Sequence, residues 1–202
     1  MKKYDVIIIG AGPAGIITGV TAKKQNPDKS MLMFKEEEKG LVPCGIPYIF
    51  HKLGDVDKNM MGPKPFVDLG GEVITEKIID VNLEKRIVKT EKGQEFTYEK
   101  LVFATGSNVV IPTFIPGHDL ENVFYIKKSY SYIKQVFDKL KFMKNIVVIG
   151  GGFIGAEVAE QLAMEQGKKV TLVECEENCF SKAFSKDLSK IATGELKKTS
   201  TD

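Results

Sequence analysis

The sequence is poor in cysteine, histidine and arginine, and each shortage argues against a class of protein. Three cysteines in 202 residues argue against a secreted scaffold held together by disulfides. Arg86 is the only arginine, whereas a protein that grips nucleic acid would normally use more arginine forks. The two histidines, His51 and His118, are too few and too isolated for a metal-ligand pattern, so no metal site is predicted.

Long apolar runs are also missing. No stretch approaches the ~20 residues that a membrane-spanning helix needs. The basic start of the chain could be taken for a signal peptide, but Asp5 interrupts it and glycines break the apolar stretch from Gly10 onward. The net charge of +2 is spread along the chain and gives no drive toward nucleic acid or an acidic membrane. We therefore expect a cytoplasmic protein whose partners are small molecules, not nucleic acid or membrane.

The residues that are present predict an α/β protein containing two Rossmann-like units. Residues 5–9 and 145–149 are short β-branched runs, each followed by a glycine turn, a helix and a second strand. The weak repeat of residues 5–36 in residues 145–174 is the most informative feature. The expected helices are 14–25, 129–143 and 156–166, and the expected strands are 5–9, 30–34, 72–75, 78–81, 86–90, 95–98, 100–103, 145–149 and 170–173. After Phe184 the sequence becomes polar, and no element is assigned there.

Both glycine turns follow the spacing of a dinucleotide-binding fingerprint. The turns read Gly10-Ala11-Gly12-Pro13-Ala14-Gly15 and Gly150-Gly151-Gly152-Phe153-Ile154-Gly155. The first glycine permits a tight turn, the second lets the backbone approach a pyrophosphate, and the third lets the helix pack closely on the strand. The helix N-terminus then offers N–H groups and a positive dipole end to the phosphates. One such turn is weak evidence, but two in strand–turn–helix–strand context predict two dinucleotide sites.

An acidic residue at the tip of the second strand should bind the ribose hydroxyls. Glu174 takes this place in the second unit and favours NADH, because the 2′-phosphate of NADPH would meet its charge. The alternative is a surface glutamate. The first unit departs from the pattern, since Lys35 stands where Glu174 does in the repeat. Glu36, one residue further on, is the candidate there.

Four segments together resemble the FAD-dependent pyridine nucleotide-disulfide oxidoreductases. They are the two glycine turns, the second extended to Glu157, with Leu101-Val102-Phe103-Ala104-Thr105-Gly106-Ser107 and Ile115-Pro116-Gly117. The resemblance implies an FAD domain of three-layer ββα/βαβ character over 1–112, a connection over 113–144, and an incomplete NAD(P)H domain over 145–202. It implies that Ile78, Ala104, Thr105 and Gly106 contribute to cofactor binding. It also places Glu157 near the nicotinamide; the alternative is a helix-surface glutamate.

Cys44 determines the branch of the family that the chain resembles. It lies alone in Pro43-Cys44-Gly45-Ile46-Pro47-Tyr48, as in the single-cysteine coenzyme A-disulfide reductases, persulfide or polysulfide reductases and certain NADH oxidases. The resemblance implies electron flow from NADH through FAD to a sulfur species on Cys44, which would cycle through a mixed disulfide, a persulfide or a sulfenic acid. A helix over 47–53 would place Cys44 at its N-terminus and stabilise a thiolate. The alternative is a small buried hydrophobe. Gly40 replaces a serine usual in the family, which weakens coenzyme A specificity.

The remaining features bear on completeness. Cys175 and Cys179 are interpreted as incidental. The resemblance implies a later flavin-binding segment and a C-terminal domain that forms a homodimer, and neither is in this sequence. We therefore expect uncovered apolar surface, marginal stability and weak or absent FAD binding. Three hypotheses stay open: an oxidoreductase completed by further polypeptide, a non-catalytic nucleotide-binding remnant, and a flavoprotein of another class. The electron acceptor, whether coenzyme A disulfide, persulfide or polysulfide, or oxygen, is also open.

Overall fold

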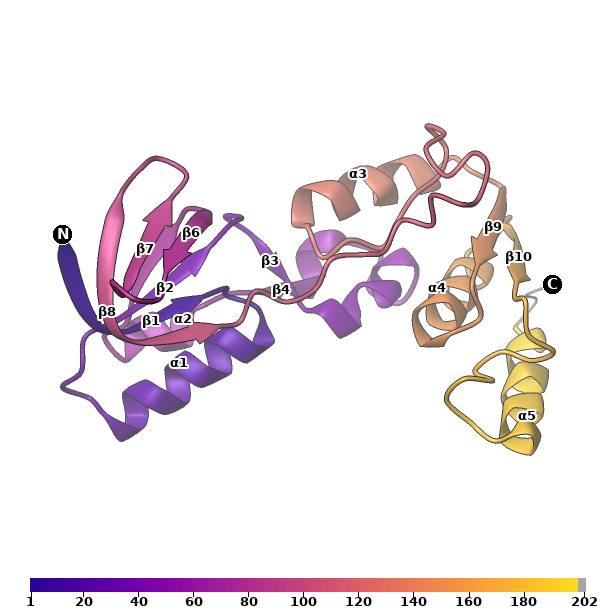
Figure 1. The fold of residues 1–202 in the computed structure, drawn as a ribbon. Coiled ribbons are helices and arrows are strands. Elements are labelled where there is room, and N and C mark those ends of the chain that lie inside the picture. Colours follow the sequence, from indigo (N-terminus) through magenta and orange to yellow (C-terminus); the bar gives the residue numbers. More distant parts are fainter. Residues whose placement is uncertain (200–202) are drawn as a thin grey trace. The chain divides into compact units, whose positions relative to one another are not determined.

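The computed structural model describes residues 1–199, which form two compact units (Figure 1). The first unit comprises Met1–Val42 and Met60–Tyr130. The second comprises Pro43–Asn59 and residues 131–199. The segment around Cys44 thus groups with the later part of the chain. The predicted FAD domain (1–112), connection (113–144) and NAD(P)H domain (145–202) are named for the cofactors they would bind, whereas these two units are defined by residue contacts. The predicted division therefore stays a prediction.

The first unit is built on a six-stranded sheet with the order β5-β2-β1-β8-β7-β6. Four neighbouring strands, β5, β2, β1 and β8, are parallel, and β7 and β6 continue the sheet antiparallel. Parallel neighbours bring the carboxyl ends of β1, β2 and β8 to one edge of the sheet. The strands are β1 (Lys2–Ile9), β2 (Met31–Lys35), β5 (Glu72–Thr75), β6 (Ile78–Asn82), β7 (Ile87–Thr90) and β8 (Glu95–Phe103), and β3 (Gly40–Leu41) and β4 (Met60–Met61) form a separate antiparallel pair.

Both faces of this sheet are covered, which explains why its central strands are apolar at successive positions. Ile8 and Met33 pack on one face with Ile16 of α1 (Pro13–Gln25) and Phe66 of α2 (Lys64–Asp68). On the other face a second cluster contains Tyr4, Ile7, Leu32, Phe34, Val88, Phe96 and Tyr98. Helices packed on a largely parallel sheet confirm the predicted α/β class. The antiparallel strands belong to the same sheet, so the three-layer character stays a prediction.

The C-terminal end of α1 is closed by a buried lysine. Lys23 is only 7% exposed, and its ammonium donates to the carbonyls of Pro27 and Lys29 at 2.7 Å each. A buried ammonium is tolerated only when its donors are satisfied, and carbonyls beyond a helix end satisfy them. Lys23 therefore fixes the connection from α1 to β2, the strand whose tip carries Lys35 and Glu36.

The second unit contains a single βαβ repeat and the segment around Cys44. Strands β9 (Asn145–Ile149) and β10 (Lys169–Val173) pair in parallel and are joined through α4 (Phe153–Ala163). The face of this pair opposite α4 lies open: Val147 is 63% exposed, Ile149 67% and Val173 48%. Open apolar strand surface is what the sequence predicts for an incomplete unit. The unit also contains α3 (Tyr130–Leu140), α5 (Lys186–Lys197) and the 3₁₀ helices Pro43–Gly45, Pro47–Phe50 and Val56–Asn59.

Several predicted elements are wrong in extent or type. The strands expected at 95–98 and 100–103 are one strand, β8, which pairs with β1 in a single register on both sides of Glu99. The helix expected at 156–166 begins at Phe153, directly after Gly152. The helix expected at 47–53 is a 3₁₀ helix of four residues. Helix α5 was not predicted, because its polar sequence buries only Ser189.

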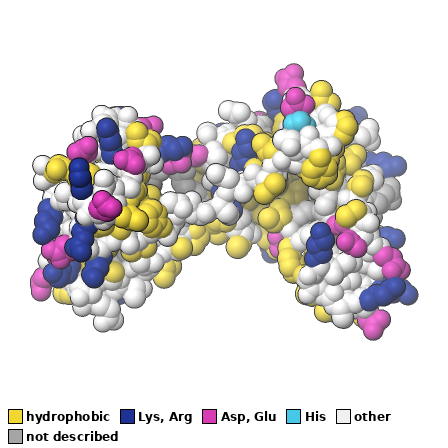
Figure 2. Space-filling view, in the orientation of Figure 1, with side chains coloured by type: hydrophobic (Ala, Val, Ile, Leu, Met, Phe, Trp, Pro, Cys, Tyr) yellow, Lys and Arg dark blue, Asp and Glu magenta, His cyan; other side chains and the backbone are white. Residues whose placement is uncertain are grey.

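Charged side chains of both signs are spread over the surface, as they are along the sequence (Figure 2). Figure 2 shows lysine and acidic side chains mixed on the visible face of each unit, without one large patch of a single sign. Among residues 1–199, no helix has the length and apolar character to traverse a bilayer. In the same range, no three histidine, cysteine or acidic side chains gather as metal ligands.

Candidate functional site

The first glycine turn lies where β1, β2 and β8 end. Gly10 has φ 111°, its N–H donates to the carbonyl of Phe34 at 2.9 Å, and Ala104 N–H donates to Ile9 at 2.8 Å. A Cβ on Gly10 would lie 2.1 Å from the Ala104 carbonyl oxygen, and one on Gly15 would lie 1.9 Å from the Gly10 oxygen. These two glycines are therefore required by packing. The structure brings Ala104 against the turn, as the sequence predicts, and leaves Thr105 and Gly106 exposed beyond it.

Gly12 differs from its two neighbours, because a Cβ there would meet nothing within 4 Å. It is the N-cap of α1, with φ −76° and ψ −177°, and no side chain caps the helix. Pro13 and Ala14, which begin α1, are exposed. The open space, the bare backbone and the uncapped helix end fit a diphosphate, which would satisfy the N–H groups that no capping side chain satisfies here.

The second glycine turn repeats this geometry. Gly150 has φ 105° and donates to the Val173 carbonyl at 2.8 Å, and a Cβ on Gly155 would lie 1.8 Å from the Gly150 oxygen. Gly152 is the N-cap of α4 with φ −75° and ψ −175°, again open and without a capping side chain. Phe153 and Ile154, the first residues of α4, are exposed. The turn therefore fits a second diphosphate in the same way.

Glu174 lies at the tip of β10 against the second turn. Its carboxylate accepts the N–H groups of Gly151 at 2.6 Å, Cys175 at 2.7 Å and Glu176 at 3.0 Å. The Glu176 and Gly151 N–H groups and the Cys175 thiol lower the pKa of Glu174 to about 2. The thiol donates to Glu174 at 3.1 Å, and this bond raises the pKa of Cys175. The carboxylate stays charged at neutral pH, as a ribose acceptor that disfavours a 2′-phosphate must.

The corresponding strand tip of the first unit is arranged differently. Glu36 is exposed and forms an ion pair with Lys77 at 2.9 Å. Lys35 turns back and donates to the carbonyl of Glu38 at 2.7 Å. Ile78 is half-buried in β6 and packs against the cluster that contains Phe34. Glu36 therefore follows β2, the neighbour of the strand that leads into the first turn, whereas Ile78 lies in β6 at an edge of the sheet. Their roles in cofactor binding stay predictions.

The loop after β10 folds back over the second turn, which the sequence did not indicate. Phe180 N–H donates to the Gly151 carbonyl at 2.9 Å, and a Cβ on Gly151 would lie 2.9 Å from the Cys179 sulfur. The Phe153 ring lies 5.4 Å from Phe180 and 5.6 Å from Phe184. The recurrence of phenylalanine at the start of α4 and in this loop was the available signal.

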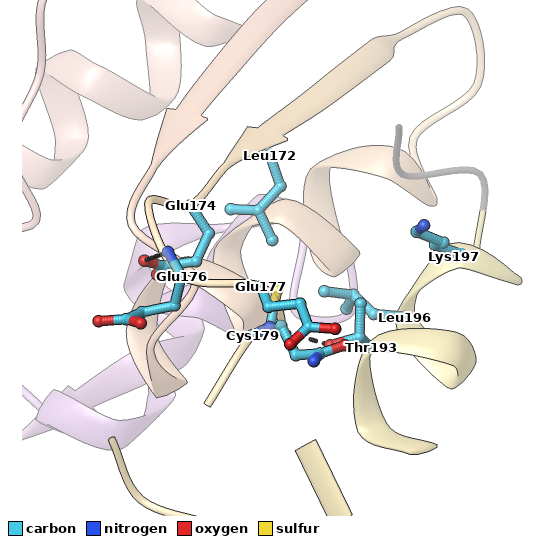
Figure 3. Close-up of a pocket in the computed structure, with 9 residues that line it drawn as sticks. Leu172, Glu174, Glu176, Glu177, Cys179, Thr193, Leu196 and Lys197 are labelled. Atoms are coloured by element: carbon cyan, nitrogen blue, oxygen red, sulfur yellow. Dashed lines mark hydrogen bonds between the residues drawn. The ribbon is translucent and has the colours of Figure 1, made fainter. Parts of the chain in front are cut away.

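A cavity of about 200 Å³ lies between the tip of β10, this loop and α5 (Figure 3). Glu174 and Glu176 lie on one side of it and Lys197 on the other, while Cys179 N–H donates to the Thr193 hydroxyl at 2.9 Å and ties the loop to α5. The cavity is lined by Leu172, Glu174, Glu176, Glu177, Asn178, Cys179, Thr193, Leu196 and Lys197. Cys179 is thus a packed, buried residue, as expected of an incidental cysteine.

Cys44 is exposed in the 3₁₀ turn Pro43–Gly45, so the alternative of a small buried hydrophobe is wrong. The helix expected after Cys44 is only a four-residue 3₁₀ helix, Pro47–Phe50. It is too short for its dipole to stabilise a Cys44 thiolate as predicted. Glu157 is half-buried on α4 in the same unit. The residues predicted to bind FAD therefore all lie in the first unit. Cys44 and the residues predicted to bind NADH lie in the second unit.

The chain has two glycine turns of matching geometry, each at the tip of a parallel strand. This arrangement is typical of oxidoreductases that bind two dinucleotides. Residues 4–201 match the family described as Pyridine nucleotide-disulphide oxidoreductase, and the chain belongs to that family. The family uses FAD and NAD(P)H, which confirms the predicted cofactor pair at the level of the family.

Curated relatives include both sulfur reductases and oxidases. The chain is 32% identical to an NAD(P)H coenzyme A polysulfide/persulfide reductase of Pyrococcus horikoshii, over 98% of this chain and 45% of the relative. It is 33% identical to an NADH oxidase of Methanocaldococcus jannaschii, over 95% of this chain and 45% of the relative. The chain therefore spans about half the length of the curated relatives it matches.

Solved structures show the same fold. A water-forming NADH oxidase from Lactobacillus brevis, bound to NADH, has a TM-score of 0.84 at 25% identity, covering 100% of this chain and 46% of that chain. A NAD-dependent persulfide reductase from A. fulgidus has a TM-score of 0.87 at 24% identity, covering 98% and 39%. The resemblance to the family and the α/β fold class predicted from the sequence are confirmed.

Proposed function

We propose that this chain supplies the FAD- and NADH-binding parts of an oxidoreductase that delivers electrons to a sulfur species on Cys44 or to oxygen. The observation that carries the proposal is the matched pair of turns, with Gly12 and Gly152 open and uncapped at nearly the same dihedral angles. FAD belongs to the first turn and NADH to the second. Bound FAD would supply the two-electron relay between NADH and the acceptor.

The chain's own residues choose the nicotinamide cofactor. Glu174 is held at the second turn by three backbone N–H groups and keeps its charge. A carboxylate has lone pairs left to accept ribose hydroxyls, whereas a 2′-phosphate would be repelled. NADH is therefore the preferred cofactor, with NADPH disfavoured.

The exposed thiol of Cys44 suits a sulfur acceptor. The Cys44 thiolate would attack one sulfur of a substrate disulfide or polysulfide, which breaks the substrate S–S bond, forms a new S–S bond to Cys44 and releases the other half as a thiolate or a shorter polysulfide anion. Two electrons and a proton then cleave that bond, releasing the substrate thiol and restoring the Cys44 thiolate. The Pyrococcus relative is named for polysulfide and persulfide, which supports this acceptor, and the oxidase relatives keep oxygen as the alternative.

Further polypeptide completes the enzyme in this proposal, as a continuation or as a second chain. The open face of the β9–β10 pair, lined by Val147, Ile149 and Val173, supports it, since relatives are about twice as long. Homodimer formation, implied by the resemblance, would reside in that remaining part.

The test, made on the chain together with the polypeptide that completes it, is flavin reduction by NADH followed by turnover with polysulfide or coenzyme A disulfide. We expect NADH to bleach bound flavin in both the parent and the Cys44→Ser variant, and turnover of the sulfur substrate to be lost only in the variant. Cys175→Ser is the control for loss of an exposed thiol, read from sulfur turnover at saturating NADH because the Cys175 thiol donates to Glu174. Sulfur turnover that survives Cys44→Ser would remove Cys44 from the reaction. Dinucleotide binding without flavin bleaching would instead support a non-catalytic remnant.

A further inference from the structure

Helix α4 connects the second glycine turn with the segment that carries Cys44, here called the cysteine segment (Pro43–Asn59). α4 begins at Phe153, directly after Gly152, and its later turns lie against the 3₁₀ helix Pro47–Phe50. We propose that Gln161 and Glu165 are positioning residues that hold the cysteine segment, and thereby the Cys44 thiol, on this helix. The inference rests on the proposed redox role of Cys44.

Gln161 makes the first of two contacts. Its side-chain oxygen accepts the N–H of Lys52 at 3.2 Å, and its amide nitrogen faces the Met164 sulfur at 3.9 Å. Gln161 is only 4% exposed, although glutamine is normally a surface residue. A buried amide is stable only when it is hydrogen-bonded, so the position of Gln161 is explained by its bond to the cysteine segment.

Glu165, just beyond the end of α4, makes the second contact. Its carboxylate lies 3.0 Å from His51 Nδ1, with both side chains about 40% exposed. An ion pair or hydrogen bond at this exposure contributes little stability by itself. Together with Gln161, it fixes two successive residues, His51 and Lys52, which determines the direction as well as the place of the chain there.

Backbone bonds carry this constraint back to Cys44. Leu53 N–H donates to Tyr48 at 2.8 Å, Ile49 N–H to Ile46 at 3.2 Å, and Ile46 N–H to Pro43 at 3.2 Å. These successive bonds span Pro43 to Leu53 and leave no unbonded hinge of several residues. The thiol therefore lies in the first of two short 3₁₀ turns that lead to the residues that α4 holds.

The neighbours of Cys44 are fixed while the thiol itself stays exposed. Ile46, Ile49 and Phe50 are buried, and the Phe50 ring lies 6.5 Å from Phe137 of α3. A Cβ on Gly45 would lie 1.9 Å from the Asn59 side-chain oxygen, and Asn59 is 4% exposed. The thiol is thus exposed on a segment whose isoleucine and phenylalanine side chains are buried and whose backbone is hydrogen-bonded. A defined attack geometry requires this arrangement.

The test measures Cys44 without any cofactor. In a Cys175→Ser background, Cys44 is the only exposed cysteine of the described residues, and its rate of reaction with an aromatic disulfide reagent reports its placement. Gln161→Leu keeps the bulk and removes the acceptor. We expect a rate change of about threefold or more, the equivalent of one lost hydrogen bond. Gln135→Leu, the same substitution at an exposed position of α3, should leave the rate unchanged.

Glu165 gives a second, independent comparison. Glu165→Ala should change the Cys44 rate, and Glu165→Gln, which keeps an oxygen for His51, should restore it. In turnover assays both Gln161→Leu and Glu165→Ala should lower kcat for the sulfur acceptor and leave KM for NADH unchanged. Variants that lose thermal stability but keep the Cys44 rate and kcat would overturn the positioning role. Normal turnover in Cys44→Ser would refute the proposed function while the thiol-rate comparison still decides the positioning role.

Discussion

Replacing Gly152 by alanine separates binding from folding in the second unit. The residue has φ −75° and an extended ψ, and its new Cβ would meet nothing within 4 Å. Alanine fits such a position, and because it restricts the unfolded chain, we expect the unfolding free energy to change by less than about 1 kcal/mol. The Cβ would, however, stand where a diphosphate approaches the backbone, so nucleotide binding should suffer.

The expected loss of affinity follows from the hydrogen bonds that this approach permits. One N–H bond to a charged phosphate contributes about 1.5–3 kcal/mol, so NADH should bind roughly 10- to 100-fold more weakly. Titration calorimetry with NADH and thermal unfolding of the same samples measure the two effects. Unchanged affinity in a folded Gly152→Ala variant would show that this turn does not hold the diphosphate.

Gly155→Ala is the matched contrast in the same turn. Its Cβ would lie 1.8 Å from the Gly150 carbonyl oxygen, so the backbone of the turn or of α4 must shift. We expect a loss of about 2 kcal/mol or more of stability, the cost of forcing extra volume into a packed site. A Gly155→Ala protein as stable as the parent would contradict the close approach of helix and strand.

Three further predictions concern stability, each measured by denaturant or thermal unfolding. Phe66→Ala removes a fully buried ring and should cost about 3–5 kcal/mol, whereas Phe142→Ala, at a residue 87% exposed, should cost less than about 0.5 kcal/mol. Lys23→Met leaves two carbonyls without their donor and should cost about 1–3 kcal/mol. Because the folded pKa of Glu174 is about 2 against an ordinary 4.5, its contribution is present above pH 4.5 and lost as pH falls toward 2. Glu174→Gln should therefore reduce acid destabilisation in that window, by less than about 1 kcal/mol because the carboxylate is mostly in solvent.

The sequence predicted the parts of the fold that depend on local pattern. β-branched runs located β1 and β9, and the glycine spacing located both turns and the helices after them. Boundaries were less certain where no local residue marks them. The break expected before Lys100 does not occur because β1 pairs with β8 in one register on both sides of Glu99, at Tyr98 and at Lys100, a contact that only the folded sheet provides.

The candidate site was predicted where residue type and the spacing from a glycine turn together indicate the chemistry. Glu174 was found by its distance from the turn, and its hydrogen bond to Gly151 agrees with the predicted place. Gln161 and Glu165 could not be found, because a glutamine and a glutamate late in a helix read as surface residues. Helix α5 was missed for a different reason: its sequence is polar on average, although its few apolar residues do recur at helical spacing.

The near-identity of the two turns has a consequence for selectivity. Backbone that meets a diphosphate with the same dihedral angles twice cannot distinguish a flavin from a nicotinamide dinucleotide. Discrimination must then come from side chains at the strand tips, where a lysine turned back on its own loop stands in one unit and an anchored glutamate in the other. If the proposed function holds, substitutions at the strand tips would change which dinucleotide each unit accepts without altering either loop.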